Sequence, residues 1–322
     1  MNPSVSSRRH FLQTVSASAL ASLAPMSTFA QVPSARKWTL NLVGGAIGVN
    51  VGQKEIIALA QKYGFESVEA RPGELATMEP AAIQELAASV SEAGLQWGSA
   101  GLPVDFRKDR NTFKQQLRKL PKMAKALQTA GVDRVSTWIM PTHAERTYLE
   151  NFELHSNRLR RVAEILKDHG QRLGMEYVGT QTLLVRDRYP FLHTLAETQE
   201  LMDSIGTGNV GVVLDSWHWW TSEDTLEQIQ QLKGEDVILV DANDAPRGVA
   251  REDQLDGNRQ LPASTGVIPI KGFLQALTTI GYDGPVRAEP FNRTLNDLEN
   301  DAACQATIDA LKKAVGLLGH EQ

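Results

Sequence analysis

The nine residues VVLDSWHWW, Val212 to Trp220, begin as an apolar segment and end in polar and aromatic residues. Three aliphatic residues are followed by Asp215, and His218 comes three positions later. A short apolar run of this kind is typical of a strand buried on both faces, as in a parallel sheet. An acid and an imidazole at its end indicate that the carboxyl end of this strand faces a polar site.

The rest of the chain alternates between short apolar segments and longer amphipathic ones. Seven further segments have the composition of strands: residues 38–45, 65–71, 95–102, 132–140, 173–179, 236–243 and 285–291. Helical spacing of apolar residues occurs between them, at residues 53–64, 80–94, 113–131 and 157–170. Each of these four segments ends in glycine, as helices commonly do.

Eight such units over about 290 residues match an α/β fold of the (β/α)8, or TIM-barrel, type in count and length. A doubly wound open sheet is the alternative. It is disfavoured because no Gly-x-Gly-x-x-Gly motif follows the first strand, where residues 43–48, VGGAIG, form only a loose glycine cluster. No linker interrupts the pattern, so we expect a single barrel domain over residues 31–322.

Residues 1–30 have the composition of a targeting segment. The stretch SRRHFL, residues 7–12, precedes a weakly apolar run and resembles the core of a twin-arginine export signal. An ordinary secretory signal or a basic terminus is the alternative. The run is too short and too rich in Ser and Ala for a stable membrane anchor. The resemblance implies a periplasmic or otherwise exported protein that folds before export.

The overall charge argues against one class of partner. The chain of 322 residues has a formal net charge of −5, which offers no basic surface for nucleic acid. Its one cysteine, Cys304, excludes an internal disulfide and leaves the redox compartment open.

Four consecutive predicted strands carry an acid near their carboxyl ends: Glu176, Asp215, Asp241 and Glu289. In a barrel of this type those ends converge on one mouth, where active sites are found. Four carboxylates in one cavity repel one another unless a cation neutralises them or some are protonated. A hard divalent metal ion with oxygen ligands satisfies that requirement.

Three segments carry a resemblance to a known family: VLDSWHWW (213–220), VDANDAPRG (240–248) and FLQALTTIGYDGPVRAEPF (273–291). They resemble the xylose-isomerase-like sugar isomerases and epimerases, which include D-tagatose 3-epimerases and inosose dehydratases. The resemblance runs from Trp38 to Leu318. By position it implies one metal ion and the following residues: Glu176, Asp215, Asp241 and Glu289 as ligands, Glu176 and Glu289 also as acid and base, and His218 and Arg247 on substrate oxygens.

Two residues depart from the pattern of that family. Asp241 stands where histidine is usual, so the all-carboxylate set favours Mn²⁺, with Mg²⁺ or Co²⁺ as alternatives to it, over zinc. Alternatively, Asp241 lies beside the site without binding the metal, and Asn243 or a water molecule is the ligand instead. Arg287 shares a face with Glu289, and we expect it to form a salt-bridge layer beneath the site with Glu69 as partner. Alternatively, Arg287 indicates that the residues of this site have diverged from the pattern of the family.

The resemblance implies a small-molecule carbohydrate substrate and proton abstraction beside a carbonyl, through an enediolate. Export favours a dehydratase or lyase, for example on 3-keto-glycosides or inososes; a sugar isomerase or 3-epimerase acting on a free ketose is the alternative. Trp138 is a candidate to stack on the sugar. The chain is a possible homo-oligomer, as its relatives are.

Two other classes compete with an enzyme acting on sugars. A non-catalytic exported sugar-binding protein would keep the barrel and lose a ligand such as Asp241. A DNA-repair endonuclease shares the barrel but needs more histidines at strand ends and a basic surface, and the sequence has neither.

Overall fold

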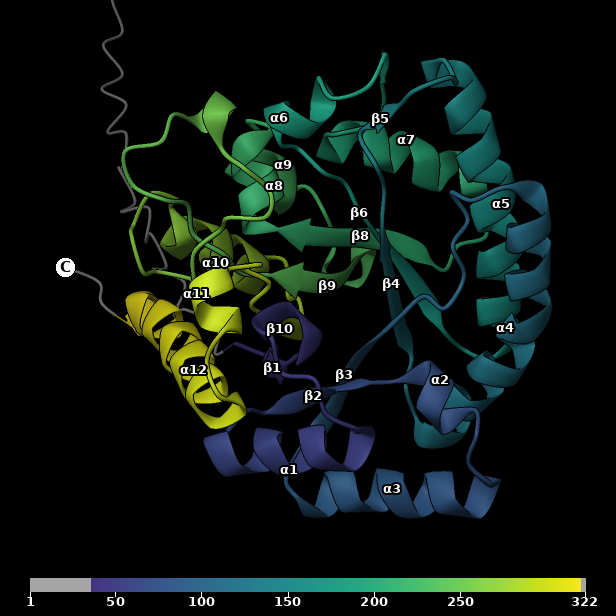
Figure 1. Ribbon diagram of the computed structural model, residues 1–322, viewed down its shortest axis with the longest axis vertical. Helices are drawn as coiled ribbons and strands as arrows, with labels where there is room; N and C mark the ends of the chain where they lie inside the picture. The colour runs from purple at the N-terminus through teal and green to yellow at the C-terminus, as the bar shows by residue number, and fades with distance from the viewer. Residues whose placement is uncertain (1–35, 320–322) are drawn as a thin grey trace, which may run out of the picture. The chain divides into compact units, whose positions relative to one another are not determined.

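The structure is a computed structural model and describes residues 36–319, so the predicted export signal at residues 1–30 lies outside the described part. Eight parallel strands form a closed barrel in the order β1-β10-β9-β8-β6-β4-β3-β2. Figure 1 shows helices such as α1, α3, α4, α5 and α12 around the outside of these strands. The predicted single-domain (β/α)8 barrel is therefore confirmed.

The barrel strands are β1 Thr39–Leu42, β2 Ser67–Ala70, β3 Gln96–Gly101, β4 Arg134–Trp138, β6 Arg172–Glu176, β8 Val210–Asp215, β9 Val237–Asp241 and β10 Pro285–Arg287. The longer helices are α1 Gln53–Tyr63, α3 Pro80–Glu92, α4 Arg110–Ala130, α5 Tyr148–Asp168, α7 Leu195–Ile205, α10 Ile270–Thr279 and α12 Asn300–Gly316. Short helices are α2 Pro72–Leu75, α6 Gln181–Leu184, α8 Ser216–Thr221, α9 Leu226–Gln230 and α11 Arg293–Asn296. A small antiparallel pair, β5 Thr142–His143 and β7 Tyr189–Pro190, lies outside the barrel.

The four predicted helices are present, but two begin earlier than predicted because of their caps. Helix α4 starts at Arg110, where the Asp109 side chain accepts hydrogen bonds from two backbone N–H groups of the first turn. Helix α5 starts at Tyr148, after a capping box between Thr147 and Glu150. The unpredicted first turn of α4 is polar and has no apolar spacing, whereas the unpredicted start of α5 contains Tyr148 and Phe152, which are spaced as on one helix face.

Strand register places the polar strand ends side by side. Asp215 at the end of β8 pairs with Asp241 at the end of β9, and Asp241 pairs in turn with Arg287 at the end of β10. Glu176 ends β6 and pairs with Val213 of β8. The carboxyl ends of four neighbouring strands thus meet at one mouth of the barrel.

Within residues 36–319, no helix combines the length and hydropathy that a membrane crossing requires.

Two barrel strands contain glycines that are closely approached by β9 or by the turn that precedes it. A Cβ added at Gly211 would lie 2.3 Å from the Asp236 carbonyl oxygen, and one at Gly174 would lie 2.9 Å from Ile238 Cβ. The contact at Gly211 is with backbone, which cannot rotate away as a side chain can.

We therefore expect Gly211→Ala to destabilise the barrel by about 3 kcal/mol, at the upper end of overpacking costs. Gly73→Ala is the matched control, because a Cβ at Gly73 meets nothing within 4 Å. Urea unfolding followed by tryptophan fluorescence measures both variants. Equal stability of the two would contradict the close approach at Gly211.

Candidate active site

The acids predicted from the sequence gather at the mouth of the barrel. Asp215 and Asp241 are fully buried and Glu176 is 7% exposed, while the Glu289 side chain is 16% exposed two residues past β10. One carboxylate oxygen each from Glu176, Asp241 and Glu289 lies within 4.8 Å of the others. Ligand atoms of Glu176, Asp215 and His218 form a second set of the same size, so Glu176 belongs to both.

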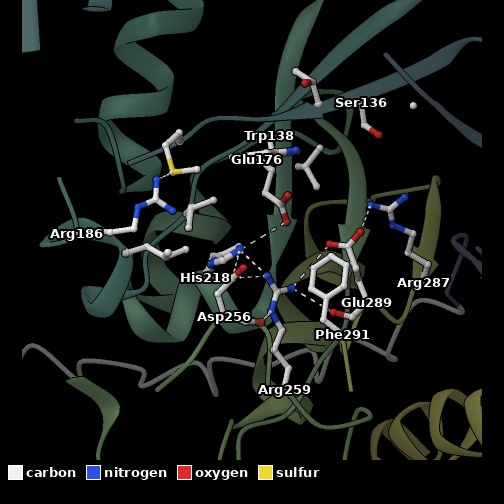
Figure 2. Close-up of a pocket in the computed structure, with 16 residues that line it drawn as sticks. Ser136, Trp138, Glu176, Arg186, His218, Asp256, Arg259, Arg287, Glu289 and Phe291 are labelled. Carbon is white, nitrogen blue, oxygen red and sulfur yellow. Dashed lines mark hydrogen bonds and ion pairs between the residues drawn. The ribbon is translucent and has the colours of Figure 1, made fainter. Parts of the chain in front are cut away.

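A cavity of about 480 Å³ opens over this cluster. Its lining includes Trp138, Glu176, His218, Arg259, Arg287 and Glu289. Figure 2 shows the carboxyl groups of Glu176 and Glu289 pointing toward one another, with His218 and Arg259 below Glu176 and Arg287 to the right of Glu289. Apolar groups such as Phe291, Val178 and Leu183 complete the wall. A volume of this size admits a small ligand of a few rings.

Asp215 is held by hydrogen bonds from three directions. Its Oδ1 accepts from the Trp217 N–H at 2.7 Å, which makes it the N-cap of α8. The Asn243 amide donates to both oxygens at 3.0 and 3.2 Å, and Arg259 Nη1 reaches Oδ2 at 2.6 Å. The carboxylate is thus fixed in place and paired with a buried guanidinium.

Asp241 forms a two-point ion pair with Arg287. Arg287 Nε lies 2.5 Å from Oδ1 of Asp241 and Nη2 lies 3.1 Å from Oδ2, and Nη2 also reaches Glu289 at 3.3 Å. The prediction that Arg287 pairs with Glu69 is wrong, because Glu69 pairs with Arg71 at 3.1 Å. The register that places Arg287 opposite Asp241 explains the difference.

Arg259 was not predicted from the sequence, yet it lies at the centre of the site. The guanidinium is 2% exposed and contacts Asp215, Asp256 at 2.7 Å and His218 Nε2 at 3.0 Å. It comes from the long segment between β9 and α10. Asp244 and Gln260 pair there through two backbone hydrogen bonds of 2.8 Å, which returns the chain to the mouth. The only sequence signal was an arginine among turn residues, in DGNRQLP.

Arg247, predicted to hold substrate, lies elsewhere. It is exposed, its guanidinium donates to the Thr265 carbonyl, and it is not among the residues that line the cavity. Arg259, twelve positions later, supplies a guanidinium inside the cavity instead.

His218 and Trp138, which were predicted to bind substrate, both line the cavity. The Gly179 N–H donates to His218 Nδ1 at 3.3 Å while Arg259 faces Nε2, so donors face both ring nitrogens. Burial, with the Arg259 charge, lowers the pKa of His218 to about 3, and the imidazole is neutral. Trp138 is 40% exposed, whereas Trp217 and Trp219 belong to the core.

The crowding of acids shifts their pKa values. Burial, reinforced by the neighbouring Asp241, raises the pKa of Glu289 to about 7 against the opposing effect of Arg287 and Arg259. Burial also raises the pKa of Asp215 to about 7, although Arg259 opposes it. Burial and three neighbouring carboxylates raise the pKa of Glu176 well above its usual value. The site therefore retains protons, or a cation in their place, near neutral pH.

The donor set fits a divalent cation. Glu176 Oε1 is buried and has no hydrogen-bond partner in the described part of the chain, which is the mark of an unused ligand atom. The four predicted acids and Asp256 (−5) outnumber the two guanidiniums that face them (+2), so the cluster keeps a negative charge that a divalent ion would offset. Oxygen ligands suit Mg²⁺, Mn²⁺ and related hard ions.

Fold and site together define a class. A family model described as xylose isomerase-like TIM barrel matches residues 57–314, and the chain belongs to this family. It is 23% identical over 250 residues to an inosose isomerase of Bacillus velezensis, a match that covers 75% of this chain and 84% of that protein. A 3-dehydroshikimate dehydratase of Pseudomonas aeruginosa is 29% identical over 143 residues, 43% of this chain and 21% of the dehydratase.

Solved structures have the same fold. A xylose isomerase domain protein from Alicyclobacillus acidocaldarius superposes with a TM-score of 0.76 at 30% identity, covering 89% of this chain and all (100%) of that one. The IOLI protein with a bound zinc atom has a TM-score of 0.71 at 21% identity, covering 86% and 98% of the two chains. A D-psicose 3-epimerase crystallised with D-fructose has a TM-score of 0.64 at 17% identity, covering 84% and 95%. Proteins similar to this chain are thus named as isomerases, dehydratases and epimerases.

The raised carboxyl pKa values predict how the metal-free protein responds to pH. An acid with a raised folded-state pKa binds more protons folded than unfolded, so the free energy of unfolding falls as pH rises through that interval. With chelator present, we expect the melting temperature to drop by roughly 5 °C between about pH 5 and pH 8. Added Mn²⁺ should restore it at about pH 8, because an ion bound only by the folded state stabilises that state. A melting temperature that rises over this interval without metal would contradict these shifts.

Replacing Asp241 by leucine tests its role, because the two possible roles predict changes in stability of opposite sign. If Asp241 served only as a ligand, Asp241→Leu would relieve repulsion and stabilise the metal-free protein. As the partner of a buried guanidinium, its loss should instead cost about 3 kcal/mol, and Asp241→Leu with Arg287→Met should recover most of that cost. Urea unfolding in chelator measures each variant. Glu69→Gln, which breaks the more exposed pair with Arg71, is the control and should cost less than about 1 kcal/mol.

Proposed function

We propose that this protein is a divalent-metal-dependent enzyme that removes a proton beside the carbonyl of a keto-sugar or cyclitol and acts as a dehydratase or lyase. The observation that carries the proposal is the pair of carboxyl groups of Glu176, which is buried, and Glu289, which is 16% exposed; they point toward one another at the same cavity. The relatives named for inosose and for 3-dehydroshikimate support a polyhydroxylated ring ketone as the substrate class.

Glu289 is the better base of the two. Arg287 lies 3.3 Å and Arg259 3.8 Å from its carboxylate oxygens, and both guanidiniums favour the ionised form. Ionised Glu289 takes the proton from the carbon beside the carbonyl, and the electron pair moves onto the carbonyl oxygen. A pKa of about 7 suits proton transfer near neutral pH.

Glu176 is the better acid. Among the described residues no guanidinium lies within 4.0 Å of its carboxyl, and burial with three neighbouring carboxylates raises its pKa well above the usual value, so of the two glutamates it has the stronger tendency to hold a proton. Glu176 gives this proton to the hydroxyl or alkoxy group that leaves from the next carbon, as the electron pair returns to form the carbon–carbon double bond. Atoms and charge balance, with water or an alcohol as the second product.

Glu176, Asp215, Asp241 and Glu289 would hold the ion, which we expect to be Mn²⁺, with His218 beside them. When bound, a divalent ion supplies electrostatic stabilisation for charge that develops on oxygen. Trp138 offers an aromatic face at the cavity wall, which suits the C–H face of a sugar ring.

An isomerase or 3-epimerase is the second candidate, favoured by the inosose isomerase and by the epimerase fold. In that case Glu176 gives a proton to carbon.

Proton NMR in D₂O distinguishes the lyase reaction from the isomerase or epimerase reaction. The substrates are inososes, 3-keto-glycosides and free ketoses, with Mn²⁺ added. A lyase yields an unsaturated ketone, and an isomerase or epimerase yields a deuterated isomer. A sugar-binding protein without chemistry yields neither, and that result would refute the enzyme.

We also propose that the reaction takes place outside the cytoplasm, because SRRHFL at residues 7–12 resembles a twin-arginine signal. Fractionation of cells that express the full chain and a variant with both arginines replaced by lysine tests the location.

The acid and base are tested by Glu176→Gln and Glu289→Gln. Each variant should lose at least about 10³-fold in kcat while the circular dichroism spectrum stays unchanged, because glutamine is nearly isosteric but transfers no proton. Glu235→Gln is the control, since Glu235 is exposed and lies just before β9 at the other end of that strand. Near-normal turnover in either active-site variant would overturn the mechanism.

A further inference from the structure

A second cavity, of about 400 Å³, lies beside the candidate active site. Three residues, Trp138, Met140 and Arg186, line both cavities and form their common wall. The second cavity lies under the segments that follow β3 and β4, and its own lining includes Lys108, Arg146 and His155. The two cavities therefore adjoin along this wall.

The common wall is braced from the side of the second cavity. The Arg107 guanidinium stacks on the Trp138 ring at 3.9 Å from its centroid and donates to the Trp138 carbonyl at 2.9 Å. Arg186 lies 3.3 Å from the Met140 sulfur and also pairs with Asp187 at 3.1 Å. One face of Trp138 is thus covered by a cation, which fixes the ring at the boundary between the cavities.

The second cavity has an excess of positive charge. Its lining carries four cationic side chains, Arg107, Lys108, Arg146 and Arg186 (+4), against two acids, Asp105 and Asp187 (−2), with histidines neutral. Arg107 and Arg186 are paired with those two acids. Lys108 and Arg146 form no ion pair within 4.0 Å among residues 36–319. Lys108 and Arg146 therefore carry two charges that no acid balances, and the Arg146 guanidinium also contacts His143 Nε2.

Buried polar atoms lie at the inner end of the same cavity. His155 is 3% exposed and its Nδ1–H donates to the Asn151 carbonyl at 2.8 Å, so Nε2 is an acceptor. Neither His155 Nε2 nor Asn151 Oδ1 has a hydrogen-bond partner among the described residues. Unsatisfied buried acceptors cost free energy, which a hydroxyl donor would recover.

We propose that the second cavity is a subsite for a sugar acid, joined to the ring that reacts in the first cavity. Lys108 and Arg146 bind the acidic group of this distal unit, and the acceptors beside His155 match its hydroxyl groups. The substrate is then a two-unit, negatively charged glycoside. The assignment of the reacting ring to the first cavity rests on the proposed function. The assignment of the sugar acid to the second cavity rests on that cavity alone.

Binding of unreactive disaccharides tests the subsite without any turnover. Calorimetric titration compares cellobiose, its analogue with a glucuronic acid as the distal unit, and cellobiose 6′-phosphate. We expect the acid to bind roughly tenfold more tightly than cellobiose, and Lys108→Ala with Arg146→Ala to remove that preference, because two cations are lost. Lys119→Ala is the matched control, since Lys119 is exposed on α4, and it should keep the preference.

Each outcome decides the proposal. Equal binding of the acid and cellobiose by the unaltered protein overturns it, as does a preference that survives the double substitution. Tighter binding of the phosphate than of the acid, lost in the double variant, also overturns the assignment to a sugar acid. If the acid is preferred through Lys108 and Arg146 but no keto-sugar is turned over, the subsite stands and the proposed reaction fails. A urea-unfolding curve for the double variant confirms that it is folded.

Discussion

The structure depends on balancing like charges that the barrel cannot separate. A closed ring of parallel strands fixes the distance between strand ends, so Asp215 and Asp241 lie side by side by register. Burial removes the water that would screen them, which makes their repulsion costly. Two guanidiniums, Arg259 and Arg287, supply part of the compensating charge. The remaining negative charge must be met by protons or by a cation, and this requirement is what gives the mouth its chemistry.

The two arginines are held at the mouth of the barrel in different ways. Arg287 lies on a strand and is fixed to Asp241 by register, so it belongs to the framework. Arg259 comes from a segment held to the barrel by the backbone pair of Asp244 and Gln260 and by the Asp244 carboxylate, which accepts from backbone N–H groups of residues 265–268. Motion of this segment would change the charge at Asp215 and His218 together. One half of the site thus takes its guanidinium from a barrel strand, β10, and the other half takes it from a loop.

The fold and the acid cluster could be predicted from the sequence because both follow from local patterns. Apolar periodicity marks strands and helices, and an acid after an apolar run marks a strand end, as at Asp215. Which charged side chains form ion pairs with one another was harder to predict. Arg287 was assigned to Glu69 because residue type does not reveal which strand lies alongside, and β10 lies between β1 and β9. Arg259 lies in a long loop without periodicity, where position along the chain gives no distance. Arg247 was favoured by position alone, yet the loop turns it toward Thr265.

The unequal surroundings of the two facing glutamates bear on which reaction the site favours. Epimerisation needs two groups that exchange roles on opposite faces of one carbon, and it is served best by groups of similar proton affinity. Here Glu289 has two guanidiniums within 4 Å, and its backbone N–H is held by Asn243, whereas Glu176 has neither. Both carboxyl groups have raised pKa values, but Glu289 is therefore the easier of the two to ionise. A fixed base opposite a fixed acid suits elimination, in which the proton removed from carbon and the proton given to the leaving group come from different residues and need not exchange.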